Sequence, residues 1–222
     1  MKHIQKQSPP PDLVAYRNTP GASYQDLYNN HHDIWEITRL SLAEEQGYIC
    51  CYCGQRITGF QGTVIEHVFP KGTPEYAGMQ LDYENNLIAS CDGGKLKRQQ
   101  NPNIPFSDLH CDTNKGSTPI PINPLDCRCE NMFLFDSDGD ILGDGPTAEA
   151  TISILNLKSP ILKSRRKAAI DAYSYVSGIK WKEEYEELNM KNQRGEYTEF
   201  CFVLRSYIEI FHACEIGGRD NA

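Results

Sequence analysis

Four cysteines in the middle of the chain have the spacing of metal ligands. Cys50 and Cys53 form a C-x-x-C pair followed by a glycine, which is typical of a tight metal-binding turn. Cys91 and Cys111 form a second pair, but residues 92–110 separate them, so that segment must loop out and return. Thiolates at the corners of a tetrahedron are common ligands of structural zinc. We therefore expect these four side chains to bind Zn²⁺ and to hold together a fold with little core of its own; the alternative is four reduced, buried thiols.

Side chains between and beside these cysteines could activate a water molecule. Glu66 and His67 end a β-branched segment, Thr63-Val64-Ile65. Histidine titrates near neutral pH and can act as a general base, and oxygen atoms of Glu66, Asn86 and Asp112 suit a hard divalent cation. Neighbouring residues on a strand point to opposite faces. Glu66 and His67 can therefore serve one site only if the strand end twists or turns.

The pattern around these residues predicts an α+β fold. Ser23, with Asp26 three residues later, is a capping signal for a helix that ends near Gly47. Short strands are expected near residues 63–67 and 86–91, and a hairpin with an acidic turn, residues 136–140, is expected at 132–142. Helical patterns follow over 148–157, 161–179 and 197–214.

We expect three parts in the chain. Residues 1–22 contain four prolines and are predicted to form an extended N-terminal arm. Residues 23–146 would form the cysteine-containing domain with its N-terminal helix and β-hairpin. Residues 147–222 would form a helical region, and its apolar stripe from Phe200 to Phe211 is the expected surface for docking a partner.

Composition limits the function classes. The 222 residues carry a net charge of −8, which argues against a protein that holds nucleic acid through its overall field. Any phosphate contact must be local or supplied by a partner. There is no run of about 18 apolar residues for a membrane span and no secretory h-region at the N-terminus, so a cytoplasmic location is the expectation.

Two basic segments have alternative interpretations. The insertion 92–110 carries Lys95, Lys97 and Arg98, and it is either a solvated loop or a finger that touches backbone phosphates. Residues 163–167 contain four basic side chains, which form either a solvated helical face or a contact for phosphate or an acidic partner.

The motifs taken together resemble a known family. Over residues 44–116 the order C-x-Y-C, I-E-H-x-x-P-K, N-L-x-x-x-C and C-D-x-x-K-G resembles the HNH endonucleases, whose core is a ββα-metal unit with a zinc clamp. The segment E-Q-G-x-x-C-x-Y-C, together with Pro124-Leu125 and the 154–166 region, is similar to the HNH subunit of Septu-type anti-phage systems. That subunit also serves as an effector in some retron systems.

The resemblance implies roles for individual residues. His67 would be the general base, and Glu66 and Asp112 would bind catalytic Mg²⁺ or Mn²⁺. Asn114 is a rival to Asp112 as the last ligand. Asn86 would either bind the metal or hold the His67 loop in place. Lys115 would contact a substrate phosphate.

The resemblance also implies partners. Proteins of this type work with an ABC/SMC-like ATPase that controls the nuclease, and their substrate is nucleic acid, either DNA or RNA such as tRNA. A second interpretation, from a different class, is a non-catalytic zinc-binding adaptor within the same kind of complex, which would use the cysteines but have no use for His67.

Overall fold

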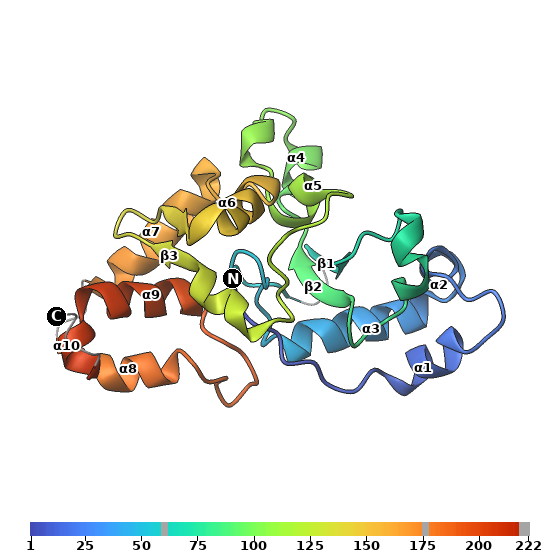
Figure 1. Cartoon of the computed structure of the whole chain (residues 1–222), viewed down its shortest axis with the longest axis horizontal. Coiled ribbons are helices and arrows are strands. Elements are labelled where there is room, and N and C mark those ends of the chain that lie inside the picture. Colours follow the sequence, from blue (N-terminus) through green and yellow to red (C-terminus); the bar gives the residue numbers. More distant parts are fainter. Residues whose placement is uncertain (59–61, 175–177, 218–222) are drawn as a thin grey trace.

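The computed structural model describes residues 1–58, 62–174 and 178–217. Two small antiparallel sheets lie among helices, which confirms the predicted α+β class. The first sheet pairs β1 (Thr63–His67) with β2 (Leu87–Cys91), with His67 opposite Leu87. Figure 1 shows this pair between the N-terminal helices and the helices of the second half of the chain.

The N-terminal arm is only partly extended. Residues 1–10 have no regular structure and pack into the molecule, with Met1 and Ile4 buried and the Lys2 amide donating to the Cys51 carbonyl at 2.8 Å. A helix, α1 (Pro11–Arg17), then begins, whereas the sequence predicted an extended segment to residue 22. Proline at the first helical position and Asp12 in the first turn both favour a helix start.

Two helices replace the single helix expected after Ser23. The Ser23 side chain accepts a hydrogen bond from the Asp26 amide at 3.2 Å, as the capping signal predicted. The first helix, α2 (Tyr24–Asn30), ends at His31, and α3 (His32–Glu45) follows at once. Asparagine is a weak helix former, so Asn29 and Asn30 make this a weak point in the helix. The break lets α2 and α3 pack on each other while α3 lies against both β1 and β2.

The strand β2 is buried along its whole length. Its outer edge is covered by a side chain, because the Gln46 amide accepts from the Ala89 amide and donates to the Ala89 carbonyl, both at 2.7 Å. The Gln46 side chain thereby satisfies backbone groups that a further strand would otherwise have to pair. This pairing joins the end of α3 to the strand pair.

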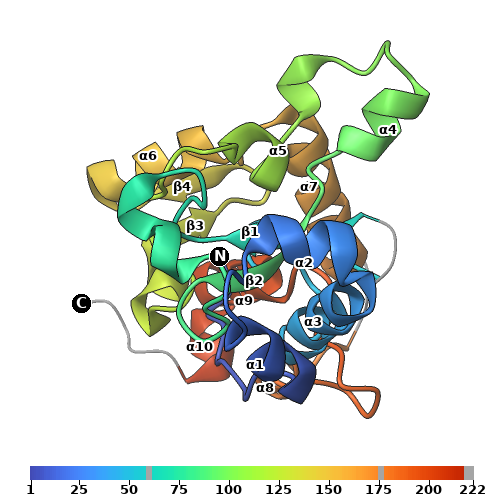
Figure 2. The same ribbon diagram turned by 90° about the vertical axis from the view of Figure 1, so that its right-hand side faces the viewer.

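Short elements connect the strand pair to the rest of the chain. They are η1 (Pro74–Met79), α4 (Lys95–Gln100), η2 (Phe106–Asp108), α5 (Cys111–Lys115) and η3 (Cys127–Met132), where η denotes a 3₁₀-helix. Figure 2 shows α4 and the chain after it projecting from the body of the molecule. The insertion therefore contains a helix in place of a continuous loop.

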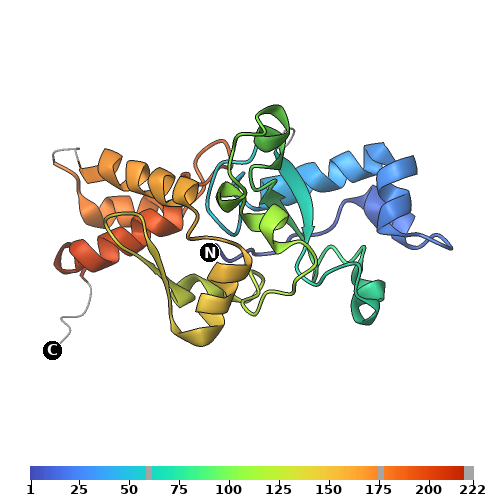
Figure 3. The ribbon, with the colours of Figure 1, turned by 90° about the horizontal axis from the view of Figure 1, so that it is seen from above.

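The predicted hairpin and the predicted helical region are both present. The strands β3 (Phe133–Phe135) and β4 (Ile141–Gly143) pair through the acidic turn. The helices that follow are α6 (Gly145–Ile154), α7 (Pro160–Ser174), α8 (Trp181–Glu187), α9 (Cys201–Phe211) and α10 (Ala213–Ile216). Of these, α7, α8, α9 and α10 gather at one end of the molecule (Figure 3). Residues 175–177 of the expected 161–179 helix lie outside the described residues.

The basic start of α7 and the acidic hairpin turn are partners of each other. The Lys163 ammonium lies 2.5 Å from Asp140, and that of Lys167 lies 3.7 Å from Asp138. Arg166 is buried and donates to the Gly139 carbonyl at 2.7 Å. Much of this basic cluster is thus committed within the chain, which leaves less of it for an external phosphate.

The apolar stripe of α9 forms core in place of the predicted docking surface. Val203, Leu204 and Ile208 are buried, and α9 packs on α7 and β3. Only the last turn presents large apolar side chains, at Ile210 and Phe211. Within the described part of the chain, none of the helices has the length and apolar character needed to cross a bilayer.

Burial differs along α9, so truncating its side chains to alanine should lower the free energy of unfolding by unequal amounts. Leu204→Ala should lower the free energy of unfolding by about 2–5 kcal/mol, because Leu204 is 1% exposed and its loss leaves a cavity. Phe211→Ala, at a position 51% exposed on the same helix, should cost less than about 1 kcal/mol. Urea denaturation of both variants measures this, and equal costs would contradict the assignment of α9 to the core.

Candidate metal centre and carboxylate–histidine site

The four predicted zinc ligands converge. The sulfur atoms of Cys50, Cys53, Cys91 and Cys111 all lie within 4.8 Å of one another, and all four residues are buried. The Cys50–Cys111 and Cys53–Cys91 sulfur pairs are 4.0 and 3.8 Å apart. Zinc–sulfur bonds of about 2.3 Å in a tetrahedron require sulfurs about 3.8 Å apart, whereas a disulfide requires about 2.05 Å. The cluster could therefore hold a metal ion such as zinc.

A backbone hydrogen bond explains how Cys91 and Cys111, which lie far apart in the sequence, come together. The insertion leaves β2 after Cys91 and returns at Cys111, and the His110 amide donates to the Gly93 carbonyl at 3.1 Å. Gly93 has φ +61°, and a Cβ there would lie 1.7 Å from the His110 carbonyl oxygen. Only glycine permits this closure. Residues 92–110 therefore form an insertion whose two ends lie close together beside the cluster.

The cluster is electrostatically incomplete without a cation. Burial raises the pKa of the Cys111 thiol well above its usual value. Burial also opposes ionisation of Cys50, but hydrogen bonds from the neighbouring thiols outweigh it and lower the pKa of Cys50 well below its usual value. The Cys50 thiolate thus forms easily and ionisation of Cys111 is resisted, because like charges in a buried site repel each other. A bound dication would remove that penalty.

Two basic residues that the sequence interpretation missed lie next to the sulfurs. The Nδ1 atom of His110 is 3.2 Å from the Cys111 sulfur and 3.8 Å from that of Cys91. Burial lowers the pKa of His110 to about 4, so the ring is neutral at pH 7. Burial lowers the pKa of Arg166 to about 10, although attraction to Cys53 opposes the shift. Arg166 therefore remains a cation that can offset thiolate charge. The position of His110 directly before Cys111 was the available sequence signal.

The predicted carboxylate ligands lie together. Glu66 is 4% exposed, and its Oε1 atom accepts from the Tyr52 hydroxyl at 3.2 Å. Burial raises the pKa of Glu66 to about 8; the Lys115 ammonium opposes this shift, and contact with the Asp112 carboxyl adds to it. Asp112 is half-buried on α5. Two carboxyl groups in contact, one of them buried, form an arrangement that favours a shared proton or a cation.

His67 lies at the end of β1 with its ring fixed on two sides. Its Nε2 atom is 3.1 Å from the Gln80 carbonyl, and the Tyr24 ring meets it edge-on with centroids 4.6 Å apart. A carbonyl can only accept, so Nε2 carries the proton and Nδ1 has the lone pair. Burial lowers the pKa of His67 to about 4. The imidazole is therefore neutral at pH 7.

Asn86 holds the loop that follows His67. Its Oδ1 atom accepts from the Phe69 amide at 2.7 Å, and its Nδ2 atom donates to the carbonyls of Phe69 and Met79 at 3.2 and 2.9 Å. The side chain is fully buried. The sequence left two roles open for Asn86, and these three bonds use its amide for positioning the loop and leave little capacity for a metal.

The predicted contact of Lys115 with a substrate phosphate does not fit this geometry. Lys115 is 2% exposed, and its ammonium lies 2.8 Å from Glu66 Oε1 and 2.9 Å from the His67 carbonyl oxygen. The side chain therefore ties α5 to β1 inside the protein. Asn114 was the alternative to Asp112 as the last metal ligand. It is exposed, and its side chain donates to the Ile154 carbonyl of α6 at 2.9 Å.

Lys71 is the surface cation beside this site. It is exposed, with its ammonium 4.1 Å from the centre of the Tyr24 ring. Burial lowers its pKa, whereas attraction to Asp112 and Glu66 raises it, so these carboxylates lie close by. The segment I-E-H-x-x-P-K contains Lys71, but its role could not be assigned without the position of Tyr24.

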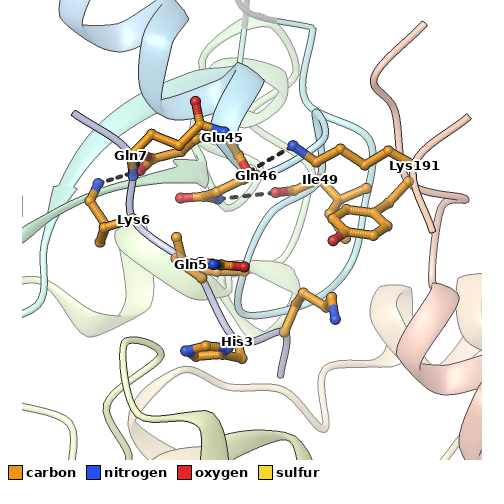
Figure 4. Close-up of a pocket in the computed structure, with 12 residues that line it drawn as sticks. His3, Gln5, Lys6, Gln7, Glu45, Gln46, Ile49 and Lys191 are labelled. Atoms are coloured by element: carbon orange, nitrogen blue, oxygen red, sulfur yellow. Dashed lines mark hydrogen bonds and ion pairs between the residues drawn. The ribbon is translucent and has the colours of Figure 1, made fainter. Parts of the chain in front are cut away.

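A polar cavity of about 360 Å³ lies elsewhere, between the N-terminal arm and the end of α3 (Figure 4). Its lysines already have partners: Lys6 pairs with Glu45, Lys2 pairs with Glu130, and Lys191 donates to the backbone carbonyl of Glu45 at 3.0 Å. Its lining includes neither carboxylate of the predicted site nor His67. The cavity is therefore separate from that chemistry.

Comparison of the chain with models of known protein families and with curated proteins found no match.

The cluster predicts how cysteine variants differ. Cys111→Ser should abolish stoichiometric zinc and lower the melting temperature, because one of four converging thiolates is lost. Cys201→Ser, at a buried cysteine of α9 outside the cluster, should keep its zinc. Mass spectrometric metal analysis with thermal melting tests both, and full zinc content in Cys111→Ser would count against the cluster as the ligand set.

The burial of Lys115 predicts a structural role. Lys115→Ala should lower the free energy of unfolding by about 1–3 kcal/mol, because Glu66 and the His67 carbonyl both lose their buried hydrogen-bond donor. Lys71→Ala, on the surface of the same site, should change it by less than about 0.5 kcal/mol. Urea denaturation compares the two, and a small cost for Lys115→Ala would show that this ion pair does not hold the site.

Proposed function

We propose that this chain is a metal-dependent endonuclease of the HNH type, which hydrolyses phosphodiester bonds of nucleic acid. The observation that carries the proposal is that Glu66 and Asp112 meet next to the four-cysteine cluster, and that Lys71 lies within electrostatic reach of both carboxylates and of His67. Apart from η1 between the strands and α4 and η2 in the insertion after β2, the elements β1, β2 and α5 follow the order strand, strand, helix, which is the order of a ββα-metal core. In this proposal the cysteines bind structural zinc.

The carboxylates fit a hard divalent cation. Magnesium and manganese prefer oxygen ligands, and Glu66 and Asp112 offer them from two different elements. The high pKa of Glu66, about 8, reflects burial together with the neighbouring Asp112. A cation would take the place of the proton that this pair otherwise favours. When bound, Mg²⁺ or Mn²⁺ would offset the negative charge that develops at phosphorus.

His67 is suited to remove a proton from water. The ring is neutral at pH 7, its Nε2–H is held by the Gln80 carbonyl, and Nδ1 accepts no hydrogen bond from the residues described. Nδ1 is thus the basic atom, and Tyr24 fixes the plane of the ring. Asn86 holds the loop around the ring, which limits reorientation of the base.

The two lysines have different tasks in this proposal. Lys115 positions Glu66 and the His67 carbonyl from inside the protein. Lys71 is exposed beside the carboxylates and takes the phosphate contact that the sequence interpretation gave to Lys115. The exposed ammonium of Lys71 supplies a local positive charge at the surface of the site, on a chain whose net charge is −8.

We further propose that the chain is the effector of an anti-phage defence complex of the Septu type, with an ABC/SMC-like ATPase as its partner. The support is the motif order over residues 44–116 and the similar segments that flank it. The acidic balance of the chain fits a nuclease whose partner engages much of the nucleic acid. DNA and RNA both present the phosphodiester that this site would attack.

His67→Ala should reduce cleavage by about 10²–10⁴-fold, the usual contribution of a general base, while the chain keeps its fold and its zinc. The assay uses the chain with its ATPase partner in magnesium, on plasmid DNA and on tRNA, with an EDTA control. His212→Ala is the matched control, since His212 lies after α9, at the far end of the chain. Full activity of His67→Ala would refute the nuclease assignment and favour the zinc-binding adaptor.

A further inference from the structure

The ring that fixes His67 is the inner member of a longer aromatic series. Tyr24 meets His67 edge-on at 4.6 Å, and its hydroxyl accepts from the Trp35 indole at 3.1 Å. Trp35 in turn contacts Tyr28 and His32, each with ring centroids 5.4 Å from its own. The series runs from the proposed general base to the surface where α2 meets α3.

The outer members of the series are uncovered. Tyr28 is 49% exposed, and the His32 side chain is 65% exposed. The His32 and Trp35 rings are stacked with an interplanar angle of 11°, and Tyr28 stands at 77° to Trp35. We call these three residues the aromatic platform. Leu27 and Leu42 are fully buried in this helix pair, and Trp35 packs partly against the same core, whereas Tyr28 and His32 are exposed beyond it. Packing of the core therefore does not account for these two outer rings.

The charges around the platform do not suit a track for phosphates. Asp33 is exposed beside His32, and Glu36 pairs with both His32 and Arg39. Attraction at this surface must therefore come from ring faces and not from cations. Base faces are uncharged, and stacking on an aromatic side chain is tolerant of base identity. In a duplex these faces are covered by neighbouring base pairs, whereas in a single strand or a loop they are free.

We propose that the platform of Tyr28, His32 and Trp35 stacks unpaired bases and so directs single-stranded nucleic acid, or the loop of a folded one, to the proposed nuclease site. This inference rests on the proposed function, because it names the substrate class of that same site. The bound nucleic-acid strand would run from the platform past Tyr24 to Lys71 and the carboxylates.

Binding is measured on the full-length, zinc-loaded chain carrying His67→Ala, which separates binding from cleavage. The probes are a labelled single-stranded DNA, the same sequence as RNA, and a blunt duplex. Tyr28→Ala and His32→Ala should each weaken single-strand binding about 5- to 100-fold, the range of one lost base stack, and leave duplex binding unchanged. Tyr28→Phe and His32→Phe keep a ring and should restore affinity.

Salt dependence and a distant ring supply the controls. Loss of a stack should lower affinity without changing the slope of log affinity against log salt, whereas Lys71→Ala should reduce that slope. Phe106→Ala, at an aromatic residue 72% exposed on the insertion, should bind as the parent does. Unchanged single-strand affinity in the Tyr28→Ala/His32→Ala double variant, or an equal loss on duplex, would overturn the platform. Loss of cleavage only in His67→Ala, with binding intact in the double variant, would overturn the platform and retain the nuclease.

Discussion

The convergence of four sulfur atoms is the constraint on which the rest of this structure depends. It joins the turn after Cys50, the end of β2 and the start of α5, three segments far apart in the sequence. The carboxylate partners are fixed by the same contact, because Asp112 follows Cys111 directly and Glu66 lies opposite Ile88 on β2. The five-residue helix α5 is too short to be stable alone, so it depends on such long-range contacts to stay against the strands.

A second constraint acts through buried charge. The Glu66–Lys115 pair lies in the interior, where desolvation cancels much of the attraction between two ions. Such a pair adds little net stability. It does fix the relative positions of the two side chains, because each partner has few alternative positions. Here the pair links α5 to β1, and the Tyr52 hydroxyl adds a second contact to the same carboxyl oxygen. The carboxylates and the imidazole are thus held by groups that do not face solvent.

Local signals in the sequence predicted local structure. The C-x-x-C-Gly spacing predicted the metal-binding turn, Ser23 predicted a helix start, and the acidic turn predicted the β3–β4 hairpin. Each depends on neighbours within a few residues. The break at His31 was missed because the apolar spacing continues across it.

Long-range partners could not be predicted in the same way. The periodicity of α9 shows an apolar face but does not say that α7 and β3 cover it. Lys115 follows a motif cysteine, yet its burial depends on where α5 lies on β1. Lys71 stands within the motif, but its place beside the carboxylates follows from the fold of the loop after His67.

Anomalous X-ray diffraction from crystals of the zinc-bound chain soaked in Mn²⁺ tests the central claim most directly. The account predicts a zinc peak about 2.3 Å from all four sulfurs of the cluster and a separate manganese peak shared by Glu66 and Asp112, with Nδ1 of His67 facing it. A zinc peak at other residues, or manganese bound away from Glu66 and Asp112, would contradict the claim that the thiolates build a site for a catalytic cation.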